Sequence, residues 1–418
     1  MRNQLGIIIS LAVFAVLEYY AFVAVNVSMR HYNPLFRTII FAIYILLTLV
    51  VWASLFTFRS WSLADWHPSL RILLISFVLG FLAGKILVAA FMLIDDLRRL
   101  VTWAIRQLSG FFPQTPKEPV EIPNGISRST FIARMAILAG GLLFSGFLYG
   151  PRNRYRYIFK RYQIPLAKLP PAFKGLKIVQ ISDIHSGSFD NQEAVAHGVD
   201  MILREKPDLI LFTGDLVNNK ATEIEPYMSL FSKLHAPMGV YSTLGNHDYG
   251  DYVEWPSAAA KVANLETLKQ HHAAMGWRLL MNEHVIFERE GQQIALLGVE
   301  NWSNMRRFPK HGDLAKAYKG TEQVPVKILM SHDPTHWDAQ IRPQYGDIDL
   351  TLSGHTHGMQ FGLRLDWMKW SPVQYVYKQW AGLYQEGQQY INVNVGYGFL
   401  GYPGRLGILP EITVIELV

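Results

Sequence analysis

Two histidines one residue apart, His355 and His357, stand between glycines in the stretch LSGHTHGMQFG, residues 352–362. In an extended strand, side chains two residues apart point to the same side, so both imidazoles would face one way. A pair of this kind is typical of a metal site. A polar turn that contains two histidines by chance is the alternative, and the rest of the chain has to decide between them.

Similar polar clusters follow four other apolar runs of the chain. They are Asp183 and His185 after IVQIS, Asp215 after LILFTG, Asn246, His247 and Asp248 after YSTLG, and His332 after KILMS. In α/β sheets, ligands bind beyond the carboxyl ends of the strands, so clusters at such ends would gather on one rim. Asp and Asn also favour ordinary turns through local hydrogen bonds. Because the pattern repeats at five strand ends, we interpret it as one shared site.

The donor atoms of these clusters indicate which metals the site would take. Carboxylate, amide oxygen and neutral imidazole suit Mn, Fe or Zn, and the chain has no cysteine that could supply a thiolate. One carboxylate can bridge two metals, and two metals about 3.5–4 Å apart form a clamp for displacement at phosphorus. Gly214, Gly245 and Gly354 would permit backbone turns that bulkier residues resist.

The chain from Lys174 onward predicts the elements that would hold these clusters. Short runs rich in β-branched residues alternate with helical stretches such as residues 191–205, which is typical of a layered α/β domain with a buried sheet. The predicted strands are residues 176–182, 208–214, 239–245, 293–299, 326–332, 349–355, 390–396 and 411–417.

The N-terminal third has a composition that predicts membrane helices. Half of the 418 residues are hydrophobic and only 17% are charged, against roughly 25% charged residues in soluble domains. Apolar runs of about 20 residues, the length that spans a bilayer, fall at residues 6–27, 38–58 and 72–94. A fourth run, residues 135–149, is shorter and could be re-entrant instead. The first run is too long for a cleavable signal peptide and has no cleavage site after it.

Charged residues in and around these runs allow more than one interpretation. Glu18 and Lys85 lie at membrane depth, where they could form a functional site or an ion pair between helices. Residues 95–134 are expected to begin as an amphipathic interfacial helix and to continue as a proline-rich linker. Residues 151–172 are expected to form a basic linker.

The side of the membrane is not set by charge, because eight basic residues flank the four runs on each side. The segment SRSTFI, residues 127–132, resembles a twin-arginine export signal that lacks its second arginine. We therefore expect an integral multi-pass protein of a bacterial cell (inner) membrane with an extracytoplasmic C-terminal domain. The net charge of +6 suits a lipid surface, and no basic tract with interleaved aromatic residues indicates nucleic acid.

The ordered series DIH, GD, GNHD, H and GHTH resembles the calcineurin-like metallophosphoesterase superfamily. The longer stretches KIVQISDIHSG, PDLILFTGDLVN and VYSTLGNHDYG resemble its membrane-anchored bacterial branch, as does the closing NVGYGFLGYPGRLGILPEITVIEL. The resemblance covers residues 173–418 and leaves out the membrane region, residues 1–150. It implies an α/β fold, a four-layer α-β-β-α sandwich of two mixed sheets flanked by helices, after a bundle of about four transmembrane helices.

The resemblance also implies a centre with two divalent metal ions, Mn, Fe or Zn. Asp183, His185 and His357 would hold the first metal, Asn246, His332 and His355 the second, and Asp215 would bridge them. A metal-bridging hydroxide would attack phosphorus, and His247 would protonate the leaving oxygen. The chain departs from the family pattern at Asn218, where relatives often carry an aspartate that orients the catalytic histidine. Asp248 is the residue that could compensate.

Residues outside these blocks leave alternatives open. Tyr397, Tyr402 and Arg405 could contact a phosphate or pack a loop. An aromatic, mildly basic insertion after GHTH could be a lid, a membrane-facing surface or part of the core; its residues are Trp367, Lys369, Trp370, Tyr375, Tyr377, Lys378 and Trp380. His271, His272 and His336 are expected at the surface.

The function that these expectations support is a membrane-anchored, dinuclear metal-dependent phosphoesterase. It would hydrolyse a phosphodiester or pyrophosphate bond, and a substrate linked to membrane lipid would suit its anchor. The alternatives are a catalytically weak metal-binding sensor or interaction protein at the membrane, and a transporter with an appended regulatory domain. Every ligand that the resemblance implies is present, which favours the enzyme. Few charges lie in the four spans, which favours an anchor over a transporter.

Overall fold

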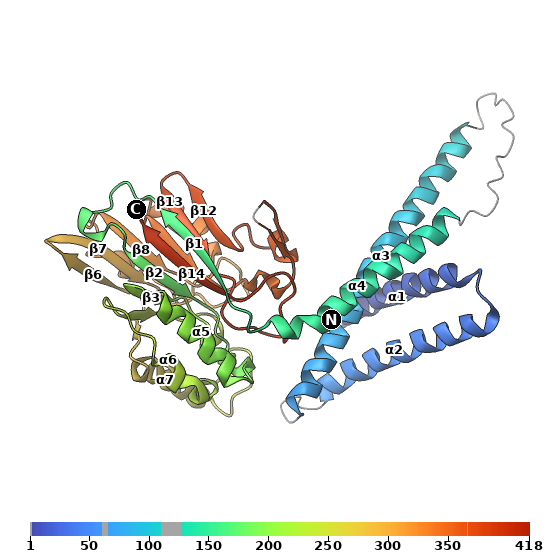
Figure 1. Ribbon diagram of the computed structural model, residues 1–418, viewed down its shortest axis with the longest axis horizontal. Coiled ribbons are helices and arrows are strands. Elements are labelled where there is room, and N and C mark those ends of the chain that lie inside the picture. Colours follow the sequence, from blue (N-terminus) through green and yellow to red (C-terminus); the bar gives the residue numbers. More distant parts are fainter. Residues whose placement is uncertain (1, 61–65, 110–126, 366) are drawn as a thin grey trace. The chain divides into compact units, whose positions relative to one another are not determined.

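The structure is a computed structural model that describes residues 2–60, 66–109, 127–365 and 367–418 (Figure 1). The chain divides into two compact units, Met1–Tyr149 and Gly150–Val418. We call them the helical unit and, after the activity that the sequence resemblance implies, the catalytic unit, and we describe each by itself.

Four long helices make up the described part of the helical unit. They are α1 (Arg2–Met29), α2 (Pro34–Ser60), α3 (Pro68–Ser109) and α4 (Arg128–Tyr149). Each contains a stretch that is long and apolar enough to cross a membrane. The fourth predicted run is longer than its apolar core indicated, because its helix begins at Arg128. Its 22 residues have the length of a spanning segment.

Helix α3 corrects the predicted division between the third span and an interfacial helix. It continues without a break past residue 94 to Ser109, and its 42 residues make a helix about 63 Å long at 1.5 Å per residue. Asp95, buried beside the predicted break, pairs with Arg98 at 2.8 Å one turn further on, so the helix tolerates the charge there. The predicted proline-rich linker lies mostly outside the described residues.

The charged pair at membrane depth is satisfied between helices. The ammonium of Lys85 on α3 lies 2.5 Å from Glu18 Oε1 on α1 and donates to Thr48 Oγ1 on α2 at 3.0 Å. Tyr44 on α2 donates to Glu18 Oε2 at 2.8 Å. The ion-pair interpretation of these residues therefore holds, and the cluster joins three helices.

Two six-stranded sheets form the centre of the catalytic unit. The first has the order β1 (Ile158–Ile164), β14 (Glu411–Leu417), β2 (Lys177–Ile181), β3 (Leu209–Phe212), β4 (Val240–Ser242), β5 (Arg278–Leu279). The second has the order β12 (Gly382–Glu386), β13 (Gln389–Val393), β9 (Leu350–Ser353), β8 (Val326–Met330), β7 (Gln292–Gly298), β6 (Glu283–Arg289). Strands β2 to β5 run parallel in the first sheet, and β7, β8, β9 and β13 run parallel in the second.

Helices cover the outer faces of the two sheets. Residues such as Leu211 of β3 and Met330 of β8 pack between the sheets in one apolar cluster. The other face of the first sheet packs against α5 (Gln192–Arg204), α6 (Met228–Phe231) and α7 (Ala258–Ala274) (Figure 1). That of the second packs against α8 (Leu314–Tyr318) and the π-helical turn η8 (Trp337–Ile341), which α9 (Arg342–Gln344) follows. The predicted four-layer sandwich of mixed sheets is confirmed.

All eight predicted strands are present, but the predicted basic linker is wrong in part. Residues 158–164 form β1, which pairs in parallel with β14 at the edge of the first sheet. Lysine and arginine are common on exposed edge strands, where they discourage pairing with other chains. The basic side chains Lys160 and Arg161 thus made an edge strand look like a linker. A two-stranded hairpin, β10 (Leu363–Arg364) and β11 (Lys369–Trp370), also escaped prediction.

Candidate metal centre

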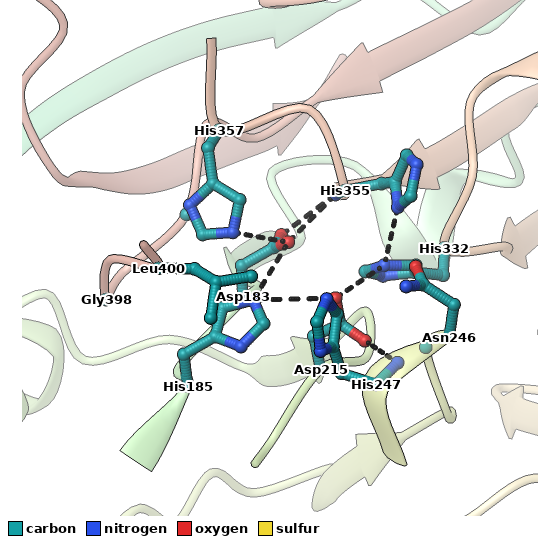
Figure 2. A network of polar contacts seen from close by, with 12 residues as sticks. Asp183, His185, Asp215, Asn246, His247, His332, His355, His357, Gly398 and Leu400 are labelled. Atoms are coloured by element: carbon teal, nitrogen blue, oxygen red, sulfur yellow. Dashed lines mark hydrogen bonds and ion pairs between the residues drawn. The ribbon is translucent and has the colours of Figure 1, made fainter. Parts of the chain in front are cut away.

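The five predicted polar clusters meet at the carboxyl ends of parallel strands from both sheets (Figure 2). Asp183 and His185 follow β2, Asp215 follows β3, Asn246 and His247 follow β4, His332 follows β8, and His355 and His357 follow β9. Because the sheets are packed face to face, strand ends far apart in the sequence reach the same rim.

Two groups of side chains at this rim have the spacing of metal ligands. Asp183, His185 and His357 form one group, and Asp215, His332 and His355 form the other. Within each group, one donor atom per residue lies within 4.8 Å of the others. His357 Nε2 is 3.2 Å from Asp183 Oδ1, and His332 Nε2 is 3.1 Å from Asp215 Oδ2. The predicted ligands are thus assembled in two sets.

Asp215 lies between the two groups. Its Oδ2 atom is 3.1 Å from His332 Nε2 in one group and 3.5 Å from His185 Nε2 in the other. Its Oδ1 atom accepts a hydrogen bond from the backbone N–H of His247 at 2.8 Å. This carboxylate therefore occupies the position that a bridging ligand would need.

Several buried donor atoms in the site have no hydrogen-bond partner among the described residues. They are His185 Nε2, His357 Nε2 and Asn246 Oδ1. The two histidine nitrogens lie near carboxylate oxygens, at 3.5 Å from Asp215 and 3.2 Å from Asp183, but form no hydrogen bond with them. Asn246 uses only its amide N–H, which donates to the Tyr252 hydroxyl at 2.7 Å, so its oxygen stays available. Unpaired buried polar atoms are costly and require an explanation. Divalent metals coordinated by these atoms would supply one, and the donor set fits Mn, Fe or Zn.

The buried charges of the site shift the pKa values of its carboxylates and imidazoles. Burial lowers the pKa of His185 and of His355, which leaves both rings neutral near pH 7. Burial would raise the pKa of Asp183, but the neighbouring His357 and His332 outweigh it and hold the pKa below its usual range. The pKa of Asp215 is likewise lowered, because His332 and His247 outweigh its burial. Burial would lower the pKa of His332, but Asp215 and Asp183 outweigh it and raise the pKa to about 10, so the ring carries a proton at pH 7. A metal bound at His332 would have to displace this proton, because only the neutral imidazole coordinates.

The backbone of the site is strained. Five of its residues have a positive φ that is unusual for non-glycine residues, namely Asp183 (52°), His185 (46°), Asp215 (61°), His355 (71°) and His357 (51°). Such conformations persist only where the surroundings enforce them, and they cluster at functional sites. Here they turn the side chains at the strand ends toward one point.

The glycines of the motifs are required for two different reasons. Gly214 has a φ of 96°, which favours glycine. Gly354 does not have a positive φ, but a Cβ there would lie 1.9 Å from Ser182 Oγ and 2.2 Å from Asp183 Oδ2. The expected permissive turn therefore applies to Gly214, whereas Gly354 is needed because the predicted ligand Asp183 approaches the backbone closely.

His247 is oriented by a backbone carbonyl of Asn218 and not by the side chain at that position. His247 Nδ1 donates to the backbone carbonyl of Asn218 at 2.8 Å. The Asn218 side chain lies elsewhere, with Oδ1 3.1 Å from His185 Nδ1. Asp248 does not compensate for it, because its carboxylate accepts four backbone N–H groups, including those of Asp215 and Gly245.

Two further residues contact the predicted ligands without having been assigned to the site from the sequence. The Tyr377 hydroxyl lies 2.7 Å from His355 Nε2. The fully buried Arg405 donates to the His357 carbonyl at 3.3 Å and lies 3.4 Å from its Nδ1. The sequence left the roles of both residues open, and only the fold shows that they contact predicted ligands. By contrast, Tyr397 is a core residue whose hydroxyl bonds to the Val195 carbonyl.

Two of the histidines expected at the surface are buried. His272 is fully buried, with Nδ1 3.0 Å from Ser242 Oγ, and His336 is fully buried, with Nδ1 2.8 Å from Ser331 Oγ. Each therefore serves as a neutral core residue, since burial lowers the pKa of His272 to about 3 and that of His336 to about 4. The expectation that these two histidines lie at the surface was wrong. Each is buried against a serine at the end of a core strand, and that contact provides its hydrogen bond.

A pocket of about 420 Å³ opens onto the metal-ligand groups. Its polar lining residues include His247, Asp215 and Arg307. Its apolar lining residues include Phe308, Val373 and Val376. The pocket can thus hold an anionic group at the histidines and an apolar group beside it.

Two protein-family models match the chain in adjacent regions. The model of "Calcineurin-like phosphoesterase" matches residues 176–359. That of "Probable Calcineurin-like phosphoesterase, transmembrane domain" matches residues 1–153. The first match includes the five polar clusters, and the second covers the helical unit.

Known relatives support the same assignment. A protein of zebrafish, Danio rerio, named "Transmembrane protein with metallophosphoesterase domain" is 32% identical over 263 residues, 61% of this chain. The match spans 56% of the zebrafish protein, so the chain accounts for little more than half of that relative. An uncharacterized metallophosphoesterase of Bacillus subtilis is 32% identical over 301 residues, 70% of this chain and 98% of the relative. The chain therefore belongs to the calcineurin-like phosphoesterase family, and with its four apolar helices it is a membrane protein.

Proposed function

We propose that the chain is a membrane-anchored phosphoesterase that depends on two divalent metals. The observation that carries this proposal is Asp215, whose Oδ2 faces one histidine from each ligand group while Oδ1 is tied to the backbone of His247. Asp183, His185 and His357 would hold one metal, and Asn246, His332 and His355 the other, with Asp215 shared.

The metals and His247 would divide the work of phosphoryl transfer. When bound, the metals would acidify water and offset the negative charge of the phosphoryl oxygens. The His247 ring lines the pocket, and its Nδ1–H is held by the Asn218 carbonyl. His247 would therefore present its other nitrogen to the substrate and pass a proton to the leaving oxygen.

The pocket suits a diester or pyrophosphate whose substituent is apolar. Arg307 lines the pocket with His247. Its guanidinium would bind the second negatively charged phosphate of a pyrophosphate, or a phosphate oxygen of a diester. Phe308, Val373 and Val376 would contact an apolar substituent of the phosphate. In a protein of the membrane, these features favour a lipid-linked phosphate as the substrate.

The catalytic unit would lie outside the cytoplasm of a bacterial cell. This placement rests on the likeness of residues 127–132 to an export signal. Since the chain has no cysteine, Val262→Cys, at an exposed position of α7, provides a single thiol. Labelling of that thiol in intact cells by a maleimide that cannot cross membranes would support the placement. Labelling only after the cells are opened would reverse it.

Hydrolysis of bis-p-nitrophenyl phosphate by the full chain in detergent tests the enzyme. Activity should be lost when the metals are stripped and should return with Mn, Fe or Zn. His247→Gln should keep its metals and lose about 10²–10⁴-fold in kcat, whereas Asp215→Asn should lose metal, as measured by elemental analysis. The exposed pair His197→Gln and Asp200→Asn on α5 provides matched controls.

One outcome would favour the binding protein over the enzyme. The chain would bind two metals in a manner that depends on Asp215, yet hydrolyse no diester, pyrophosphate or monoester. That result would leave the metal centre in place as a sensor or interaction site. A chain that binds no metal would contradict both proposals.

A further inference from the structure

Exposed apolar side chains are concentrated in one short stretch of the catalytic unit. Among the described residues of Gly150–Val418, twelve large hydrophobic side chains are exposed, and eight of them lie between Met359 and Val376. We call six of them the aromatic lip: Met359, Trp367, Met368, Trp370, Tyr375 and Val376. Trp367 is 79% exposed and Tyr375 is 77% exposed. Apolar residues gathered in this way usually mark a surface that contacts a partner or a membrane.

The aromatic lip borders the mouth of the metal pocket. Met359 and Val376 line the pocket and are more than half exposed. The indole N–H of Trp370 donates to the Tyr375 hydroxyl at 3.4 Å, which connects the hairpin β10–β11 to the 3₁₀ turn η10 (Pro372–Tyr375). The exposed apolar surface is therefore continuous with the apolar wall of the site.

The inner side of the same segment is fixed to the catalytic unit. Tyr377 and Trp380 are buried, and Tyr377 contacts His355. Ser371 Oγ donates to the Gly358 carbonyl at 2.9 Å. The rings of Trp370 and Tyr375 thus lie next to residues that are held in place from within the catalytic unit, and one of these, Tyr377, contacts the candidate metal centre.

The lysines of this segment are occupied within the domain. Lys369 Nζ donates to the Ala381 carbonyl at 2.8 Å and lies 3.9 Å from the centre of the Tyr384 ring. Lys378 lies 3.4 Å from Glu386 and 3.8 Å from Asp338. Whatever binds the aromatic lip would therefore be held by its aromatic and apolar side chains rather than by these two lysines. Trp and Tyr are the residues enriched where proteins meet the lipid–water interface.

The catalytic unit follows directly, along the chain, a helix that can span a membrane. Helix α4 ends at Tyr149, and the next residue, Gly150, already belongs to the catalytic unit. The Gly150 carbonyl accepts a hydrogen bond from the backbone of Arg405 at 3.1 Å, in the loop whose Leu400 lines the metal pocket. The point where the chain enters the catalytic unit is therefore tied to the same loop as the mouth of the site.

We propose that the aromatic lip docks on the lipid bilayer that holds the four helices, so that the mouth of the metal pocket opens at the membrane surface. Trp367, Trp370 and Tyr375 would lie in the interface, and the apolar wall formed by Met359 and Val376 would be continuous with the acyl chains. The proposal that the aromatic lip docks on the bilayer does not depend on the catalytic activity. The further step, that a substrate enters from the bilayer, rests on the proposed function.

The absence of cysteine allows a direct test with single labelled thiols. Trp367→Cys and Tyr375→Cys would each be labelled with the fluorophore NBD in the full chain, reconstituted in phosphatidylcholine nanodiscs. Val262→Cys on α7, 61% exposed and outside the lip, is the matched control. We expect lipids with a doxyl quencher on the acyl chain to quench NBD at positions 367 and 375 and to leave position 262 bright. The quenching should not require phosphatidylglycerol and should persist in high salt.

Each other outcome would overturn the proposal. Equal quenching at all three positions would mean nonspecific contact, and quenching that needs anionic lipid would mean attraction by charge. Blue-shifted NBD without doxyl quenching, together with two chains per disc by mass measurement, would assign the lip to a second copy of the chain. A labelled variant that still hydrolyses bis-p-nitrophenyl phosphate is folded. Lack of quenching in such an active variant would therefore contradict the docking proposal and leave the proposed enzymatic activity unaffected.

The consequence for substrate entry can be measured separately. Trp367→Ser combined with Tyr375→Ser should lower the rate on a phosphate diester with a long acyl chain in vesicles by about tenfold, because two rings leave the interface. Hydrolysis of the water-soluble diester gives the reference rate for the same variant. Equal changes on the two substrates would separate the lip from substrate delivery.

Discussion

The hydroxyl of Tyr377 lies 2.7 Å from Nε2 of His355. The other ring nitrogen of His355, Nδ1, lies 3.3 Å from His332 Nε2 (Figure 2 shows the rings of His355 and His332). One nitrogen of His355 thus faces the second ligand group and the other faces the phenol. Burial raises the pKa of Tyr377, so the phenol keeps its proton. A hydrogen bond from Nε2–H to the phenol oxygen would leave the Nδ1 lone pair free for a metal, which is the usual function of such outer contacts.

Replacing Tyr377 by phenylalanine should therefore weaken the second metal. Tyr377→Phe removes the hydroxyl that fixes the ring of His355, and losses of such contacts lower metal affinity by about 10–100-fold. Titration of the stripped chain with Mn²⁺ would show one site unchanged and one weakened. The control Tyr384→Phe removes a hydroxyl that accepts from the backbone of Trp380 instead. Equal affinities in wild type and Tyr377→Phe would rule out this role.

Adding one methyl group at Gly354 should disrupt the first metal group. The new Cβ of Gly354→Ala would lie 2.2 Å from Asp183 Oδ2, so the ligand has to move. We expect loss of metal from this group and a destabilisation of about 3 kcal/mol or more from overpacking. Gly346→Ala is the matched control, because its Cβ would meet nothing within 4 Å. Metal analysis and thermal unfolding measure both effects, and equal metal content in the two variants would contradict the prediction.

The clustering of the predicted ligands could be expected from the sequence, because each of them follows a strand whose direction the sequence reveals. The run before Asp215 is apolar and short, as parallel strands buried on both faces are. Once such strands are parallel, their carboxyl ends share a rim, and Asp183, Asn246 and His332 come together without knowledge of the loops. Residue type alone then indicates what the rim can bind.

The rest depends on loops and partners that no local pattern reveals. Tyr377 reaches His355 through the turns after β11, and Arg405 reaches His357 across the C-terminal loop. The strand β1 was missed because an edge strand needs no alternation of apolar residues on its exposed side. His272 is buried because Ser242, 30 residues away, provides its partner. In each case the deciding contact is long-range.

The buried histidines outside the site should make the catalytic unit sensitive to acid. Burial lowers the pKa of His272 to about 3 in the folded state, whereas an unfolded histidine titrates near 6.5. Between these values the unfolded state binds the extra proton, so stability falls as the pH drops below about 6.5. At pH 5 the loss would be about 2 kcal/mol for this residue.

Thermal unfolding in detergent between pH 7 and pH 5 measures this loss. His272→Asn should flatten the dependence relative to wild type, whatever its effect at pH 7, because asparagine does not titrate. The exposed His197→Asn on α5 should leave the slope as it is. A variant at position 272 with the slope of wild type would show that another group controls the acid response.

Replacing only one member of the Glu18–Lys85 ion pair should destabilise the helical unit more than replacing both members. Lys85→Met leaves the Glu18 carboxylate with the Tyr44 hydroxyl but without its cation, which lies 2.5 Å away in the intact pair. Loss of one partner of a buried pair costs about 3–5 kcal/mol, whereas removal of both is often close to neutral. The double variant Glu18→Gln, Lys85→Met should therefore unfold at a higher temperature in detergent than Lys85→Met alone. If the effects of the two changes were to add, the residues would not stabilise the helical unit as a pair, and the functional interpretation of these charges would return.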